Sequence, residues 1–253
     1  MRPDPIVKVK HLSKQAPTAS TGSLSKHFDW ADITFDADKG IVLLRQKWKY
    51  IWQAKYPFSH WKAEEKRAFH ERAEEQIWSL WNRKALVHVR AESAAPPATK
   101  SLIERLKGRW PEIIFDVQWV TESPQWNVVV SKEGRSLRFD PVQKIMRPML
   151  PNAHVNWETR EAQLYQISLE PGVARHPVTN ERFNTNFNTV AHEFGHFLKN
   201  VDEQGDPSKG GFIEADLASL MNIGDQLRIR HFEAIKGALS SMIPGCTFAV
   251  VVK

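Results

Sequence analysis

Two histidines and a glutamate with HExxH spacing are the residues of this chain best suited to chemistry. His192, Glu193 and His196 lie in the run HEFGHF. Residues four apart in an α-helix project from one face, so both imidazoles can bind one metal ion, and neutral imidazole suits zinc. Glu193 would lie beside the open coordination position, where it can take a proton from water at the metal and pass it to a leaving amine. The spacing predicts one catalytic Zn²⁺ and a zinc-dependent endopeptidase, with Glu193 as the catalytic carboxylate.

The helix that carries this motif is predicted over residues 186–199. One apolar stripe is expected to pack against the core and to leave both histidines off the main packing face. The stripe consists of Phe187, Val190, Ala191, Phe194, Phe197 and Leu198. Gly195 costs the helix about 1 kcal/mol relative to alanine, so we expect another element, the backbone beneath the metal, to come close there.

A catalytic zinc site needs a third protein ligand. The spacing favours Asp202, six residues after the second histidine, and Glu203 is its neighbour. The alternative is a gluzincin-like arrangement, in which a carboxylate on a following helix is the third ligand. Glu214, or else Asp216, would then serve.

The run from residue 192 to residue 202 resembles the extended HExxHxxGxxH/D signature of the metzincin clan, in the aspartate-ended form of snapalysin-like peptidases. In that clan a glycine ends the helix and lets the chain turn back to present the third ligand. Lys199 occupies this position, and Asn200 is expected to form the left-handed helix end one residue later. The run SLMN at 219–222 resembles the Met-turn, which implies that Met221 forms a soft packing floor beneath the histidines.

Three further candidates lie in the run LRIRHF. Arg228, Arg230 or His231 could donate a hydrogen bond to the oxyanion of the tetrahedral intermediate, and His231 is taken as the second catalytic residue. The alternative is a basic helix start that faces solvent. His176, in ARHP ahead of the active-site helix, is a weaker candidate.

The pattern over residues 192–231 is most similar to the C-terminal metallopeptidase extensions of VgrG spike proteins of the type VI secretion system. The match covers about a sixth of the chain. The resemblance implies an antibacterial toxin that a type VI secretion spike carries covalently into the periplasm of a target cell. It also implies a peptide or protein substrate and a cognate immunity protein.

Composition narrows the class of protein. With 253 residues, 42% hydrophobic and 25% charged, the chain can form a sizeable core. The single cysteine, Cys246, excludes an intrachain disulfide and a Cys-rich zinc site. The N-terminus has no apolar signal region, and no run approaches the roughly 18 to 20 apolar residues of a membrane helix. We therefore expect synthesis in the cytoplasm without a signal peptide, and no membrane span.

The chain is divided by its sequence pattern into a linker-like segment, 1–27, and a single domain, 28–253. The domain has an N-terminal part to about 202 and a C-terminal part, 203–253. Helices are predicted at 59–82 with Ser59 as N-cap, at 101–107, near 213–220 and near 230–241. Strands are predicted at 85–91, 113–121, 126–131, 163–169 and 248–252. This order is α+β, and the resemblance implies a metzincin-like fold with a mixed sheet, a long backing helix, an active-site helix and a helical C-terminal part.

Two non-catalytic functions compete with the peptidase. The formal charge of +6 and the segment 45–52, RQKWKYIW, would suit a nucleic-acid-binding module, because aromatics among cations can stack on bases and contact phosphate. The expectation is nevertheless that no nucleic acid binds, since a tryptophan-rich core edge with snorkelling lysines explains this segment better. An adaptor domain with a structural zinc ion is the other alternative, and a fourth protein ligand would favour it.

Overall fold

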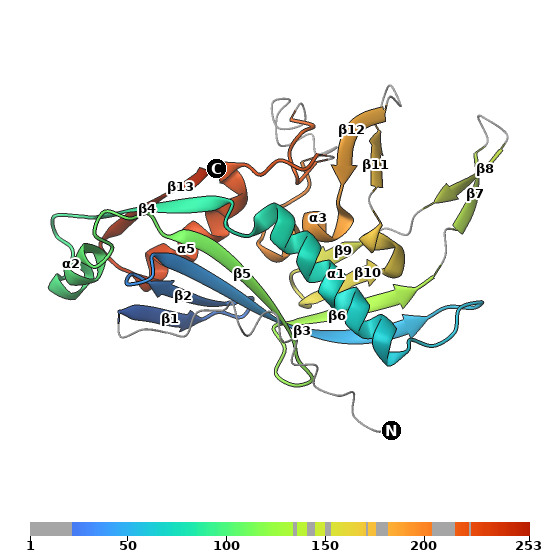
Figure 1. The fold of residues 1–253 in the computed structure, drawn as a ribbon, viewed down its shortest axis with the longest axis horizontal. Coiled ribbons are helices and arrows are strands. Elements are labelled where there is room, and N and C mark those ends of the chain that lie inside the picture. The colour runs from blue at the N-terminus through green and yellow to red at the C-terminus, as the bar shows by residue number, and fades with distance from the viewer. Residues whose placement is uncertain are drawn as a thin grey trace.

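The structure, a computed structural model, describes residues 22–133, 136–140, 145–149, 153–170, 172–175, 182–203, 216–222 and 224–253. A nine-stranded mixed sheet forms the centre of the protein (Figure 1). Its main path runs β13-β4-β5-β3-β6-β10-β9, and β1 and β2 continue from β3. The predicted α+β class with a mixed sheet is therefore confirmed.

The long strand β3 (Ile41–Ala54) organises this sheet. It pairs in parallel with β5 (Glu112–Trp119) and β6 (Trp126–Lys132) and antiparallel with β2 (Asp32–Asp36). The first half of β3 pairs with β2 and the second half with β6, so one strand joins two parts of the sheet. The remaining strands of the sheet are β1 (Ser23–His27), β4 (Ala85–Ala91), β9 (His154–Asn156), β10 (Glu161–Tyr165) and β13 (Cys246–Val252).

Two short antiparallel pairs stand apart from the main sheet (Figure 1). They are β7 (Ser136–Asp140) with β8 (Ile145–Met149), and β11 (Gly172–Arg175) with β12 (Arg182–Phe187). The second pair leads directly into the helix that carries the HExxH motif.

Two helices pack on the core face of the sheet. These are the long helix α1 (Ala63–Trp81), which crosses the sheet in Figure 1, and α3 (Thr189–Phe197). The fully buried indole of Trp81 joins them, because its Nε1 donates to the carbonyl of Ala191 at 2.8 Å and its ring lies 5.7 Å from that of Phe194. This contact fixes α3 against α1.

The predicted elements are largely confirmed, and their ends differ. α1 begins at Ala63, with Lys62 as its N-cap residue, so the prediction of Ser59 as the cap is wrong. The helix predicted at 101–107 is α2 (Pro97–Glu104), which begins earlier because Pro97 suits the first helical turn. The segment predicted as a strand at 163–169 is β10 followed by a 3₁₀ turn, η1 (Gln166–Leu169).

Both ends of the predicted domain layout need correction. Ser23–His27 belong to the sheet as β1, so the segment 1–27 is not linker throughout. The C-terminal part contains η3 (Ile229–Phe232) and α5 (Glu233–Met242), but β13 then joins the main sheet beside β4. Described residues 216–222 form turns and not the helix predicted near 213–220, whose first residues lie outside the described ranges. The C-terminal part is therefore only partly helical.

The segment 45–52 forms part of β3, where successive side chains alternate between the two faces. Trp48 and Tyr50 are buried in the core, whereas Lys47 and Lys49 point to the opposite face. The aromatic rings and the cations therefore do not form one surface, which removes the support for a nucleic-acid-binding strand. None of the helices in the described ranges is both long and apolar enough to cross a membrane.

Candidate metal centre

The helix α3, which contains the HExxH motif, begins with a side-chain cap. The Asn188 side-chain oxygen accepts a hydrogen bond from the Ala191 backbone N–H at 3.0 Å, which satisfies one of the unpaired donors at the helix start. Phe194 and Phe197 anchor the opposite face in the core. With that face fixed, His192 and His196 share the remaining face, and their ring centroids lie 5.0 Å apart.

The structure brings Asp202 to these two histidines. Its Oδ1 lies 3.0 Å from Nε2 of His192 and 3.2 Å from Nε2 of His196. Among the residues that the structure describes, His192, His196 and Asp202 form a group that could hold a metal ion, because one ligand atom from each lies within 4.8 Å of the others. The histidine side chains are 10% and 15% exposed and that of Asp202 is 62% exposed, so the group is open to solvent on the aspartate side.

Hydrogen bonds on the far side of each ring set the histidine tautomers. Nδ1 of His192 lies 2.7 Å from the carbonyl oxygen of Leu220, and Nδ1 of His196 lies 2.8 Å from that of Asn200. A carbonyl can only accept, so each Nδ1 carries the hydrogen and each Nε2 of a neutral ring presents a lone pair. Two nitrogen lone pairs and a carboxylate then face one another, an arrangement that a cation stabilises. Such tethering by the second ring nitrogen is typical of metal-binding histidines.

The pKa directions agree with a site that attracts a cation. Where a ring carries a second proton in place of a metal ion, its Nε2 donates to Asp202, and such hydrogen bonds from His192 and His196 hold the pKa of the Asp202 carboxyl far below its ordinary value. Burial lowers the pKa of His196, but the hydrogen bond to Asp202 and the charge of Glu193 outweigh it, so the net pKa is raised. A proton or a metal ion would offset the negative charge that Asp202 and Glu193 place beside the two rings.

Glu193 lies next to this group without joining it. The residue is 6% exposed, and its buried Oε2 has no hydrogen-bond partner among the residues that the structure describes. Burial raises the pKa of Glu193, the two histidines lower it, and the charge of Asp202 raises it again, with a net increase. A buried carboxylate oxygen without a partner is costly, so this oxygen is suited to receive a proton or a water molecule.

The chain turns sharply after α3 to deliver Asp202. Lys199 has a φ of +67°, the left-handed conformation, although it is not glycine. The backbone N–H groups of Lys199 and Asn200 donate to the carbonyls of His196 and Gly195, at 3.0 and 3.1 Å, which is the Schellman pattern of helix ends. The left-handed residue therefore stands at the position of the clan's glycine, and the expectation that Asn200 would take this conformation is wrong.

Asn200 stabilises the same corner through its side chain. Its Nδ2 donates to the carbonyl of Gly195 and to that of His231, both at 3.0 Å. Its own carbonyl receives the hydrogen bond from His196. The asparagine thus joins the helix end, one candidate ligand and the segment around residue 231.

Met221 packs directly beneath α3. A Cβ atom at Gly195 would lie 2.1 Å from the sulfur of Met221 and 3.2 Å from the ring of Trp81. Another element does approach at the glycine, as predicted, but it is a side chain and not the backbone. Leu220, the neighbouring residue, supplies the carbonyl that accepts from Nδ1 of His192. One turn therefore provides both the side chain packed beneath α3 and the group that orients His192.

His231 is placed behind this turn. It is 1% exposed, its Nδ1 accepts from the backbone N–H of Arg228 at 3.1 Å, and its Nε2 lies 3.1 Å from Oγ of Ser219 and 3.4 Å from Glu203. Burial lowers its pKa. Both ring nitrogens are thus engaged in contacts within the fold, and we do not assign His231 a role in the proposed chemistry.

The alternative third ligands are engaged elsewhere or lie outside the described residues. Glu203 accepts two hydrogen bonds from Arg230, and Asp216 accepts from Arg228 and Arg230. Glu214 lies outside the described ranges, as does His176, the weaker candidate from the run ARHP. Of the candidates that the structure describes, Asp202 is the one beside the histidines.

Trp157, in the turn between β9 and β10, was not anticipated from the sequence. Its indole N–H donates to the carbonyl of His196, and the ammonium of Lys199 lies 4.7 Å from the centre of its ring. It therefore contacts both the second histidine and the left-handed corner. No local pattern marks it, because the contact joins residues 39 positions apart.

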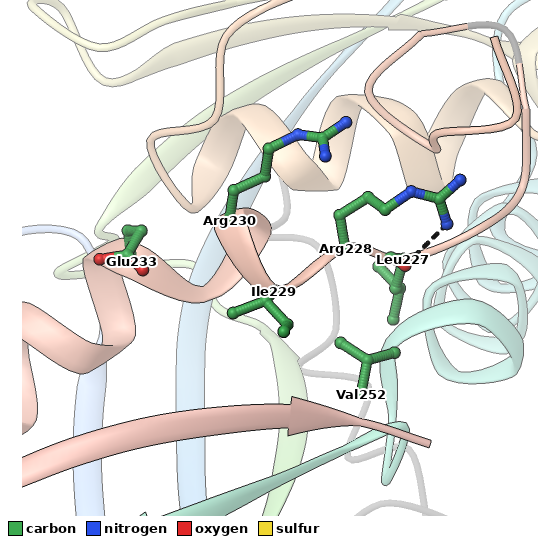
Figure 2. Close-up of a pocket in the computed structure, with 6 residues that line it drawn as sticks. All are labelled: Leu227, Arg228, Ile229, Arg230, Glu233 and Val252. Carbon is green, nitrogen blue, oxygen red and sulfur yellow. Dashed lines mark hydrogen bonds between the residues drawn. The ribbon is translucent and has the colours of Figure 1, made fainter. Parts of the chain in front are cut away.

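A pocket lies beside η3, on the segment that contains the two arginines (Figure 2). Its lining residues are Leu227, Arg228, Ile229, Arg230, Glu233 and Val252, and none of the three candidate ligands is among them. The group formed by His192, His196 and Asp202 is thus distinct from this pocket.

The sequence matches no protein-family model and no curated protein.

Proposed function

We propose that this protein is a zinc-dependent peptidase in which His192, His196 and Asp202 bind the metal and Glu193 transfers the proton. The observation that carries the proposal is the convergence of two Nε2 atoms and one carboxylate oxygen, with tautomers set by backbone carbonyls. Three protein ligands leave a coordination position for substrate, as catalytic zinc sites require.

The proposed roles follow from the position of each group. When bound, zinc would supply a Lewis acid that polarises a peptide carbonyl and lowers the pKa of water. The Glu193 carboxylate would accept the proton of the attacking water and return it to the leaving amine. Its burial and raised pKa support this role, because a carboxylate that holds a proton more readily is the better base near neutral pH. The Leu220 and Asn200 carbonyls would keep both imidazoles oriented.

A metzincin-like arrangement of the site is part of the proposal. Two features support it beyond the HExxH motif: the left-handed residue at the position of the clan's glycine, and a methionine packed under the helix at Gly195. Both depend on the turn geometry and not on the ligands themselves, so they are independent of the convergence described above.

The test compares Glu193→Gln with Glu75→Gln. Glu75 is exposed on α1 and serves as the matched control for loss of one carboxylate. Purified protein should bind about one zinc ion, and wild type should cleave fluorescein-labelled casein in a zinc-dependent manner. Glu193→Gln should keep the zinc and lose cleavage by at least about a hundredfold, whereas Glu75→Gln should match wild type. Full activity of Glu193→Gln, or no zinc bound by wild type, would overturn the proposal.

The sequence resemblance to spike-borne peptidases supports a second part of the proposal: a type VI spike delivers the protein, which acts in the target periplasm. Expression in a test bacterium with an added export signal should then be toxic, and cytoplasmic expression should not be. The Glu193→Gln variant should remove toxicity. Equal growth in all cases would refute the delivery proposal and would leave zinc binding to be judged separately.

A further inference from the structure

The segment 228–232 contacts three parts of the candidate metal centre. Arg230 binds Glu203, the residue after the third ligand, through two parallel hydrogen bonds of 2.7 and 2.8 Å. Nε2 of His231 lies 3.1 Å from Oγ of Ser219, at the start of the methionine turn. The carbonyl of His231 accepts from the Asn200 side chain at 3.0 Å. One short segment therefore joins the helix corner, the stretch that contains Asp202 and Glu203, and the turn.

The residue after Asp202 is buried and anchored in the fold. The side chain of Asp202 is 62% exposed, whereas that of the adjoining Glu203 is 6% exposed, and the backbone N–H of Glu203 donates to the carbonyl of Met221 at 3.0 Å. The backbone next to Asp202 is thus held at Glu203. Displacement of Glu203 would move the third ligand and the methionine turn together.

Arg230 is the group that makes this anchoring possible. A buried carboxylate needs a charged partner with several hydrogen bonds, and the planar guanidinium supplies two to one carboxylate. Arg230 also donates to Asp216 at 2.6 Å, which links it to the residues that precede the turn.

We propose that Arg230 is a positioning residue for the third metal ligand, which it holds through Glu203. The inference rests on the proposed zinc site. Figure 2 shows the side chains of Arg228 and Arg230 extending to the same side of their segment, away from Ile229 and Val252. The two arginines share Asp216 as a partner, but only Arg230 is bonded to Glu203.

Because only Arg230 is bonded to Glu203, substitutions at the two arginines can be compared. Arg230→Met and Arg228→Met each remove one cation that pairs with Asp216, and only the first removes the partner of Glu203. Zinc affinity is measured by competition with a chromogenic chelator, and the visible spectrum of the Co²⁺-substituted protein reports the ligand geometry. Urea denaturation of the metal-free proteins measures the loss of stability in each variant.

Arg230→Met should weaken zinc binding about tenfold or more and change the Co²⁺ spectrum, as for other outer-shell residues. Arg228→Met should keep the zinc affinity and the Co²⁺ spectrum of wild type, even if it loses as much stability as Arg230→Met. If both variants bind zinc as wild type does, Arg230 has no positioning role. Equal weakening in both would also refute it, because loss of a shared ion pair would then explain the effect.

A conservative variant covers the case in which Arg230→Met does not fold. Arg230→Lys keeps the cation but cannot make two parallel bonds to one carboxylate, so it should still weaken zinc binding. Wild-type affinity in Arg230→Lys would overturn the inference. Absence of zinc binding by the wild-type protein would instead overturn the proposed function, so the two failures are distinguishable.

Discussion

Alanine at Gly195 should destabilise this protein, although the same change stabilises most helices. Gly195 lies inside α3, where alanine would ordinarily add about 1 kcal/mol to the free energy of unfolding. Here the new Cβ would lie 2.1 Å from the Met221 sulfur and 3.0 Å from its methyl carbon. Ordinary contacts between such atoms begin near about 3.5 Å, so the sulfur would have to retreat by roughly 1.5 Å.

The surroundings of Met221 limit that retreat. The side chain is 1% exposed, its backbone N–H donates to Ser219, and its carbonyl accepts from Glu203. Overpacking of a tight core costs about 1–3 kcal/mol, which exceeds or cancels the helical gain. We therefore expect Gly195→Ala to lower the free energy of unfolding by about 0–2 kcal/mol.

Gly237 is the matched control, because it also lies inside a helix, α5, and a Cβ there would meet no heavy atom within 4 Å. Urea denaturation of the metal-free proteins should show Gly237→Ala more stable than wild type by about 0.5–1 kcal/mol. The two substitutions are chemically identical, so the difference between them measures the contact beneath α3.

A double-mutant cycle then identifies the contact. Met221→Ala alone should cost about 2–5 kcal/mol, since it empties a buried site. In that background Gly195→Ala should become stabilising, with a coupling energy of about 1–3 kcal/mol between the two positions. A coupling near zero, or a Gly195→Ala protein as stabilised as Gly237→Ala, would refute the packing of methionine against glycine.

Two further predictions concern the core and the helix corner. Burial, with the charge of Asp116, raises the pKa of Glu74 to about 9, so the folded state holds a proton that the unfolded state releases above its ordinary pKa of 4.5. The free energy of unfolding should therefore fall as pH rises from 5 to 8, by on the order of 1 kcal/mol per pH unit. Urea titrations of Glu74→Gln should show no such slope. Wild type and Glu74→Gln with the same dependence on pH would contradict the prediction. At the corner, Lys199→Val should be about 1–2 kcal/mol less stable to urea than Lys199→Gly, because a β-branched residue tolerates the left-handed conformation poorly. Equal stabilities would show that φ at this residue is not constrained.

Elements with a clear local period could be predicted from the sequence. The stripe along α1, the alternation in β4 and the spacing of the two histidines each depend on neighbours within one or two turns. β3 was missed, although its alternation is visible once the strand is known. The nucleic-acid-binding alternative took its aromatics and cations as one surface, whereas a period of two places Trp48 and Lys49 on opposite faces, as the preferred core-edge interpretation requires.

The supports of the site could not be predicted, because they come from distant parts of the chain. The Leu220 carbonyl that orients His192 lies 28 residues away, and the indole that binds the His196 carbonyl lies 39 residues away. The conformation of Lys199 has the same cause. The left-handed conformation costs a lysine about 1–2 kcal/mol. The Schellman hydrogen bonds and the contact with Trp157 offset that cost, and both exist only in the folded protein.

His192 and His231 show why residue type alone does not define a site. Both are buried, and backbone groups, whose hydrogen-bonding roles are fixed, contact Nδ1 of each ring. At His192 the partner is a carbonyl, so Nδ1 carries the hydrogen and Nε2 offers a lone pair toward Asp202. At His231 the partner is an N–H, so Nε2 must carry the hydrogen and donate toward Ser219. The fold therefore leaves a lone pair on Nε2 of His192 and a hydrogen on Nε2 of His231, and a motif that names only histidine cannot separate these two states.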